Sequence, residues 1–301
     1  MNRILVIGAQ NIDIFSKSSQ DFIMGDSNPS KINISFGGVA RNIAVNLSRL
    51  GHDIHFISVF GDDAFSQSAQ QNLKELKINI SQSLFLKKQN NSIFIGVMDQ
   101  KNDLHLGLSD MEIVEFLNPD FFRIKKEYID KFDVLVIDNN LSIKSIAYLL
   151  NQYHSKKIIM DAVSSQKAVK LIPYLHQIKV LKVNQLELRM LSNTITIKEQ
   201  LNDLHNGGVQ TILLTQQEKD VILSRKNEYM VETPPKVENI VNTSGAGDAF
   251  LSGFIHGMVN GYNDIQKIRF ANSAARITMN SKDSTSSELN NNEIIKHIIN
   301  E

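Results

Sequence analysis

Residues 240–255 read IVNTSGAGDAFLSGFI, a polar, glycine-rich turn that runs directly into an apolar segment rich in small residues. Glycines at such a junction let the backbone approach a ligand closely and adopt positive φ angles. The free N–H groups at the start of a helix then favour a negatively charged ligand. The stretch therefore predicts an anion-binding turn, Gly245-Ala246-Gly247, at the beginning of a helix.

Asp248 follows this turn and falls in the first turn of the predicted helix. A carboxylate repels phosphate, so the pairing makes chemical sense if Asp248 accepts a hydroxyl proton while the N–H groups stabilise the transferred group. The alternative is a simple helix start, where acidic residues are favoured for electrostatic reasons alone. The segment is neither a Walker A loop nor a dinucleotide-binding fingerprint.

Outward from this stretch, short apolar runs alternate with segments of helical period. Near-continuous apolarity is typical of strands in a parallel sheet that is covered on both faces. The alternation predicts a doubly wound α/β fold with a mainly parallel sheet flanked by helices. The predicted strands are Arg3–Ile7, Ile54–Val59, Asp133–Ile137, Lys157–Met160, Val180–Val183 and Thr211–Leu214, and the predicted helices include Val39–Leu50, Phe65–Leu76, Ile143–Gln152 and Ile197–His205.

Two stretches, residues 12–36 and 90–108, depart from this rhythm. They contain the alternating runs Lys31–Phe36 and Ser92–Met98, which indicate strands with one solvent-facing side. We expect a small antiparallel sheet, inserted in a single domain of residues 1–301, that covers a ligand site as a lid. Since edge strands seek partners, the lid is also a candidate surface for a homodimer.

Composition narrows the function classes. The chain has 32 basic and 32 acidic side chains, which gives no electrostatic reason to expect nucleic acid or a membrane as a partner. The absence of cysteine excludes thiol catalysis and disulfide scaffolds, and the histidines have no metal-ligand spacing. No window approaches the ~20 apolar residues of a membrane span. The start of the chain lacks a signal-peptide pattern, so we expect a cytoplasmic protein.

A second motif lies near the start of the chain and reads GGVARNIA over residues 37–44, followed by Leu50-Gly51 and Gly61-Asp62-Asp63. This motif and NTSGAGDAFLSGF together resemble the two signatures of the ribokinase-like (PfkB) carbohydrate kinase family. The resemblance implies a ribokinase-like fold over nearly the whole chain. It also implies an enzyme that uses ATP with Mg²⁺ to phosphorylate a hydroxyl group of a small sugar or nucleoside.

Softer matches are similar to one branch of that family, the bacterial pseudouridine kinases. They are residues 26–32, 109–111, 138–140, 161–164, 181–187 and Asn242. The implied reaction is phosphorylation of the 5′-hydroxyl of pseudouridine. Two alternatives stay open: a kinase for another nucleoside or a furanose sugar such as ribose or fructose, and a sensor that binds such a ligand without catalysis.

The resemblance assigns roles to residues that match the family motifs. Asp248 matches the catalytic base, and Gly245, Ala246 and Gly247 match the anion hole. The residues that match substrate contacts are Asp13, Gly38, Asn42, Asp110 and Asn140. Two of these have a structural alternative, because Asp13 would also cap a strand end and Asp110 would also cap a helix before Glu112.

Asn184 and Glu187 match the Asn-x-x-Glu element of the family, in which Glu187 would hold magnesium through water. Their spacing equally fits a capping box at a helix start. The residues that match nucleotide contacts are Asn184, Thr215, Ser244, Gly245, Gly247, Asn272 and Ala275, the last two with ordinary helix packing as the alternative. Asn242 stands where the family has Asp beside a monovalent-cation site, so its loss of charge is expected to weaken potassium dependence.

Overall fold

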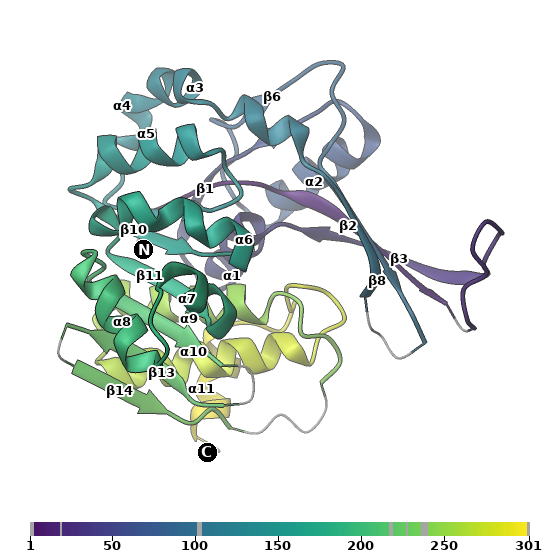
Figure 1. Ribbon diagram of the computed structural model, residues 1–301. Coiled ribbons are helices and arrows are strands. Elements are labelled where there is room, and N and C mark those ends of the chain that lie inside the picture. The colour runs from purple at the N-terminus through teal and green to yellow at the C-terminus, as the bar shows by residue number, and fades with distance from the viewer. Residues whose placement is uncertain are drawn as a thin grey trace.

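The computed structural model of the protein describes residues 3–18, 20–100, 104–216, 219–226, 228–235 and 240–299. A central eight-stranded sheet has the order β14-β13-β12-β11-β10-β9-β1-β4 (Figure 1). Neighbouring strands from β12 to β4 pair in parallel, which confirms the predicted α/β fold. The parallel strands are β1 (Arg3–Ile7), β4 (Asp53–Ile57), β9 (Val134–Asp138), β10 (Lys157–Asp161), β11 (Val180–Asn184) and β12 (Thr211–Thr215).

The sequence pattern missed two further strands, which extend the sheet at one edge. β13 (Val221–Arg225) and β14 (Glu228–Glu232) pair antiparallel, β13 with β12 and β14 with β13. Most residues of β14 are exposed or half-buried. An edge strand of this kind lacks the continuous apolar run on which the other strands were recognised.

Helices cover both faces of the sheet and form two cores. On β1, Leu5 and Ile7 pack in one core while Ile4 and Val6 pack in the other, as expected from the alternation of side chains along a strand. The first core includes side chains of α3 (Pro119–Ile124), α5 (Ile143–Tyr153), α6 (Ser165–Ala168), α7 (Gln185–Leu191) and α8 (Ile197–Asn206). The second includes side chains of α1 (Val39–Arg49), α2 (Ala64–Glu75), α9 (Ala246–Val259) and α10 (Asp264–Met279).

Shorter elements complete the main body. They are β5 (Val59–Phe60), β6 (Leu84–Phe85), the 3₁₀ helices η1 (Glu112–Phe116) and η2 (Val169–Gln177), α4 (Lys126–Ile129) and α11 (Asn291–Ile299). No helix within the described ranges is long and apolar enough to cross a membrane.

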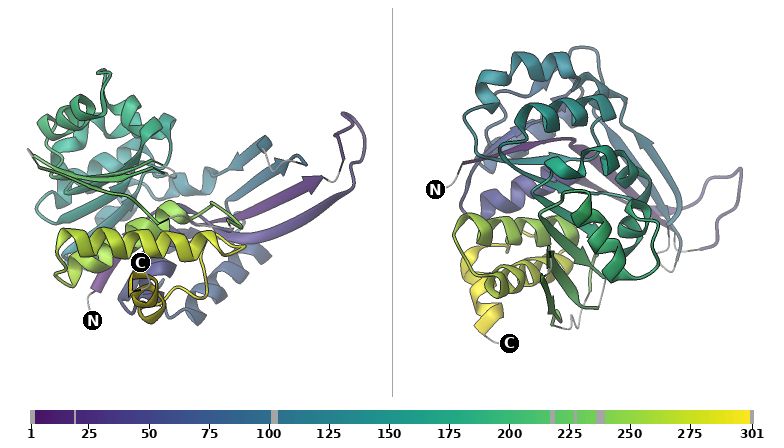
Figure 2. Two further views of the ribbon diagram at one scale, coloured as in Figure 1. Left: turned by 90° about the horizontal axis from the view of Figure 1, so that it is seen from below. Right: turned by 60° about the vertical axis from the view of Figure 1, so that its left-hand side comes forward.

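A second, four-stranded sheet projects from the main body, as the left view of Figure 2 shows. Its order is β3-β2-β7-β8, formed by β2 (Asn11–Ser18), β3 (Ser30–Gly37), β7 (Ile93–Met98) and β8 (Leu104–Asp110). These are the two stretches predicted as a lid, except for residues 101–103, which lie outside the described residues. The prediction of an antiparallel sheet was wrong at one pair: β2 and β7 run parallel, because both strands leave the main body in the same direction.

Candidate functional site

A cavity of about 470 Å³ lies where the lid, α1 and the start of α9 meet. It brings together residues from the two sequence motifs that carry the family resemblance, which are about 200 residues apart in the chain. The predicted residues that line it are Asp13, Gly38, Asn42, Asn140, Ser244, Gly245 and Asp248. The carboxyl ends of the parallel strands of an open α/β sheet are where such folds bind ligands. Asp138 ends β9 and holds Asn140 beside this cavity, so the site lies at that edge of the sheet.

The turn before α9 has the geometry that the sequence predicted. Gly245 is the N-cap of the helix with φ of 76°, a left-handed conformation that glycine adopts without strain. A side chain at Gly245 would also meet the backbone of Ser284. Of the residues that the structure describes, none accepts a hydrogen bond from the N–H groups of Gly247 and Asp248. Both donors are therefore free for an anion at the positive end of the helix.

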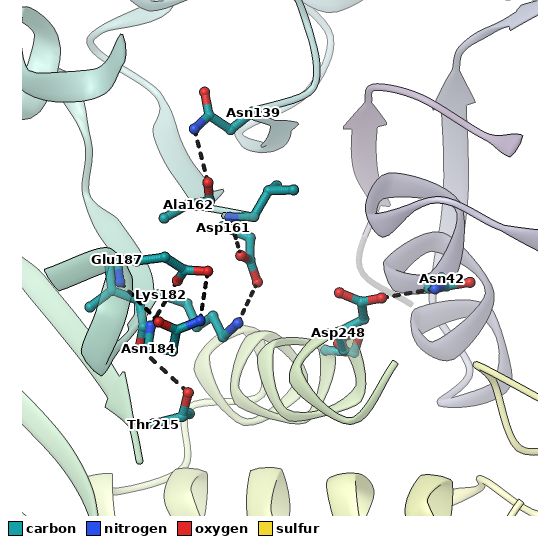
Figure 3. Close-up of polar contacts among 12 residues, drawn as sticks. Asn42, Asn139, Asp161, Ala162, Lys182, Asn184, Glu187, Thr215 and Asp248 are labelled. Carbon is teal, nitrogen blue, oxygen red and sulfur yellow. Dashed lines mark hydrogen bonds and ion pairs between the residues drawn. The ribbon is translucent and has the colours of Figure 1, made fainter. Parts of the chain in front are cut away.

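Asp248 is buried beside this turn, with only 8% of its surface exposed. Asn42 Nδ2 donates a hydrogen bond to Asp248 Oδ2 at 2.8 Å, so that α1 and α9 meet at the carboxylate (Figure 3). Burial, together with the nearby charge of Asp161, raises the pKa of Asp248 from 3.8 to about 7, against the lowering effect of Asn42 and Lys182. A carboxyl group with this pKa exchanges a proton readily near neutral pH.

Lys182 is a site residue for which the sequence analysis made no prediction. Its Nζ forms an ion pair with Asp161 Oδ2 at 3.0 Å, and a Cβ added to Gly247 would lie 2.9 Å from the same Nζ. Burial acts to lower the pKa of Lys182, but the charges of Asp161 and Glu187 outweigh it, so the pKa is raised. A charged amine therefore lies against the first turn of α9. The available signal was a lysine inside the otherwise apolar strand VLKV.

Asn184 and Glu187 form the capping box that was the structural alternative for this pair. Glu187 Oε2 accepts from the backbone N–H of Asn184 at 2.7 Å, and Oε1 accepts from Asn184 Nδ2 at 2.8 Å. Each oxygen keeps a second lone pair, and magnesium commonly retains water ligands. Glu187 thus fits a magnesium ion through water, while Lys182 occupies the space between its carboxylate and Asp161 (Figure 3).

Asp13 of β2 and Gly38, the N-cap of α1, also line the cavity. Asn11 Nδ2 donates to Asp13 Oδ1. Burial raises the pKa of Asp13 to about 6, while Arg41 and Asn11 act to lower it. Gly38 has φ of 99°, and a Cβ there would lie 2.7 Å from the carbonyl oxygen of Ala9, so the position requires glycine.

Asn140 also lines the cavity, whereas Asp110 does not. Asn140 Nδ2 donates to Asp138 Oδ1 at 2.8 Å, and its Oδ1 accepts from Lys167 Nζ. Lys167 lines the same cavity and was not predicted. The carboxylate of Asp110 accepts from the N–H of Glu112 at 3.3 Å, which is the capping alternative. Its neighbours in the chain, Ser109 and Met111, line the cavity instead.

Of the predicted nucleotide residues, Ser244 and Gly245 line this cavity, whereas Thr215, Asn272 and Ala275 do not. Thr215 ends β12, and its hydroxyl donates to the carbonyl oxygen of Val183 at 3.5 Å. On α10, Asn272 is buried, and Ala275 packs against the second core, as the helix-packing alternative expects. The assignment of these three residues to ATP stays a prediction.

Asn242 joins the two loops on either side of the anion turn. Its Oδ1 accepts from the N–H of Ser244 at 2.9 Å, and its Nδ2 donates to the carbonyl oxygen of Lys282 at 2.9 Å. Both polar atoms of the amide are thus used within the protein. No cluster of three or more acidic or histidine side chains suited to a metal ion occurs among the described residues.

Known proteins resemble this chain in sequence, and solved structures share its fold. Residues 1–291 match the pfkB family of carbohydrate kinases. The chain is 28% identical to the pseudouridine kinase of Escherichia coli over 92% of its own length and 90% of that protein. It is 29% identical to the uncharacterized sugar kinase YeiI of the same species, over 91% of the chain and 77% of that protein. The ribokinase of Arabidopsis thaliana, solved with ribose and ATP, has the same fold, with a TM-score of 0.87, 18% identity and coverage of 99% and 98%.

Proposed function

The chain belongs to the pfkB family of carbohydrate kinases, and we propose that it transfers the γ-phosphoryl group of ATP to the 5′-hydroxyl of pseudouridine. Kinases of this family are phosphotransferases that act on an alcohol group. The observation that carries the proposal is the buried Asp248 carboxylate beside the free N–H groups of α9. The choice of pseudouridine is supported by the similarity to the enzyme of Escherichia coli.

Asp248 acts as the general base in this proposal. Its pKa of about 7 means that roughly half of the molecules carry the ionised carboxylate at neutral pH. Asn42 donates to one carboxylate oxygen and so holds the side chain in place, which leaves the other oxygen to accept the hydroxyl proton. The cavity is lined by both residues, so a substrate hydroxyl within it reaches the base directly.

The start of α9 receives the negative charge of the transferred group. The N–H groups of Gly247 and Asp248 and the amine of Lys182 are fixed before substrate binds, which is the condition for stabilising a charged transition state. Magnesium, when bound with ATP, neutralises phosphate charge, and Glu187 would hold it through water. Phosphoryl transfer relies mainly on such positioning and charge stabilisation.

The substrate side of the cavity combines hydroxyl-binding and base-binding groups. Asp13 is placed to accept hydrogen bonds from sugar hydroxyls, and its raised pKa follows from its burial there. Lys167 and Asn140 present a donor and an amide, which suit the carbonyl and N–H groups of a uracil ring. Phe94 lines the same cavity and offers a surface for the flat base.

Substrate turnover tests the proposal. The protein is incubated with MgATP and, separately, with pseudouridine, uridine, ribose, fructose or adenosine, and ADP formation is measured. We expect ADP with pseudouridine and its loss, by more than about 100-fold, in Asp248→Asn. Turnover of a bare sugar or another nucleoside would refute pseudouridine as the substrate but keep the role of Asp248. Ligand binding without any turnover would favour the sensor.

We also propose that the lid forms a homodimer. The face of the lid opposite Asp13 exposes four large apolar side chains, which are Ile32, Ile34, Leu106 and Leu108. An apolar face of this size on a projecting sheet favours a second copy as its cover. We expect a dimer by light scattering, which Leu106→Lys weakens and Ile195→Lys, at an apolar residue with 93% exposure on the main body, leaves unchanged. A wild-type monomer would refute this.

A further inference from the structure

A second cavity, of about 450 Å³, lies on the other side of α1 from the catalytic cavity. None of its lining residues lines the first cavity. Residues that are adjacent in the chain line different cavities. Arg41 and Thr285 line the second cavity, whereas their neighbours Asn42 and Ser284 line the first. The mechanism proposed above uses no residue of this second cavity.

Arg41 is the central cation of this cavity, and only 5% of its surface is exposed. Its guanidinium donates to neutral oxygens only: to the carbonyl of Phe36 at 3.3 Å, to Asn42 Oδ1 at 3.3 Å, to Thr285 Oγ1 at 3.5 Å and to Asn72 Oδ1 at 2.7 Å. Within the described part of the chain, no carboxylate lies within ion-pair distance of this group. Buried charges in proteins are usually paired, so Arg41 is an exception that needs a reason.

Arg49 lies on the same helix and lines the same cavity. It donates to the carbonyl oxygen of Ser286 at 2.6 Å and, like Arg41, has no carboxylate partner among the described residues. Burial and the charge of Arg49 lower the pKa of Arg41 to about 10, against the raising effect of Asp13 and Asp283. Two guanidinium groups are therefore held close together although they repel each other.

The rest of the lining favours hydrogen bonds to an oxyanion. Hydroxyl groups come from α2, from the lid and from the loop before α11, as Ser35, Ser68, Ser281, Thr285 and Ser287. The loop also contributes Asp283, whose charge acts to raise the pKa of both arginines. The lining itself therefore has one acidic group against two guanidinium groups, while Asp13, whose charge also acts to raise the pKa of Arg41, lines the catalytic cavity instead.

We propose that this second cavity is a binding site for a phosphate group, either as the free ion or as the head of a small phosphomonoester. Guanidinium groups match the geometry of phosphate oxygens, and hydroxyl side chains supply further donors. A bound dianion would compensate the charges of Arg41 and Arg49, for which the described residues supply no ion pair. The volume of about 450 Å³ leaves room for a substituent beyond the phosphate group.

Binding is measured by calorimetry with inorganic phosphate and, in a separate arm, with ribose 5-phosphate. Pseudouridine and a nonhydrolysable ATP analogue saturate the catalytic cavity, and ionic strength is matched with chloride. Tighter binding of ribose 5-phosphate than of inorganic phosphate would identify a phosphomonoester as the ligand class, and the reverse would identify the free ion. Binding of neither by the wild-type protein overturns the proposal.

Variants locate the site. Arg49→Gln should weaken binding at least about tenfold, because it removes a charge-assisted partner of the anion. Arg189→Gln, at an exposed arginine of α7, carries the same change of charge and should leave binding unchanged. Equal weakening in the two variants, or none in Arg49→Gln, refutes the site. If Arg49→Gln fails to fold, Ser68→Ala replaces it, because this variant deletes one hydroxyl group of the lining. Ser68→Ala should then weaken binding more than Arg189→Gln does, and unchanged binding refutes the site.

Discussion

The hydrogen bond between Asn42 and Asp248 sets the pH at which the proposed base becomes active. The pKa of Asp248 is about 7 with the amide of Asn42 in place, and this amide acts to lower it. A hydrogen bond to a charged group contributes about 1.5–3 kcal/mol, and 1.36 kcal/mol corresponds to one pKa unit. Asn42→Ala should therefore raise the pKa by roughly one to two units.

At pH 7, the ionised fraction of Asp248 would fall from about one half to roughly 1–10%, since the pKa would be about 8–9. The value of kcat/KM at pH 7 should then fall about five- to fiftyfold and recover with rising pH. The assay is the profile of kcat/KM against pH for ADP formation, because this parameter reports the pKa of the free enzyme.

A matched control comes from the same helix. Asn46 lies one turn further along α1 and is fully buried, and no described residue forms a hydrogen bond with its side-chain amide. Asn46→Ala also deletes a buried amide and should keep the midpoint of the profile near pH 7. A loss of substrate contact by Asn42→Ala would lower the whole profile without moving it. An unmoved midpoint in Asn42→Ala would therefore refute the assignment of Asp248 and Asn42 as a coupled pair.

Three further outcomes are expected. Since burial raises the folded-state pKa of Asp248 from 3.8 to about 7, its contribution to stability is complete below pH 4 and is lost as pH rises through 7. At pH 8, the free energy of unfolding of Asp248→Asn should consequently exceed that of the wild type by up to roughly 4 kcal/mol. Near pH 4 the two proteins should be equally stable, and thermal unfolding at both pH values measures the difference. Gly245→Ala should reduce both stability and turnover, because it adds a clash with the facing loop to the cost of a left-handed backbone. Gly261→Ala is the control, because Gly261 also has a left-handed φ of 75° but open space around an added Cβ. It should lower the free energy of unfolding by only about 1–2 kcal/mol, the cost of the left-handed backbone, and leave turnover intact. Equal losses of stability in the two variants would show that the clash at Gly245 is not decisive. Replacing potassium by tetramethylammonium should change turnover little, because Asn242 donates directly to the carbonyl oxygen of Lys282 and so joins the two loops without a cation. Asn242→Asp should create a potassium requirement, and a strong requirement in the wild type would contradict this reading.

Local pattern was sufficient for the six parallel strands of the main sheet and for the glycine-rich turn before α9. The six parallel strands are continuous apolar runs because both of their faces are covered, and such runs are visible without knowledge of the neighbours. The anion turn was visible for a similar reason: Gly245, Gly247 and Asp248 are adjacent in the chain, and their chemistry depends on one helix start.

Features that depend on which strands pair with each other could not be predicted from local sequence pattern. The parallel pairing of β2 with β7 and the two added edge strands depend on which strands meet, which a period of two residues does not specify. Similarly, the family resemblance offered Asp110 as a substrate contact, whereas the pleat of β8 turns Ser109 to the cavity.

The sequence by itself determined the α/β class, the lid segments and the identity of the proposed base, because each follows from residues close together in the chain. Only the tertiary structure decided that Lys182 reaches the start of α9, that Asn42 contacts Asp248, and that the buried Arg41 has no ion-pair partner among the described residues. These facts join residues from distant elements. Their electrostatic effects arise from burial and from distances of a few ångströms, and folding alone fixes both.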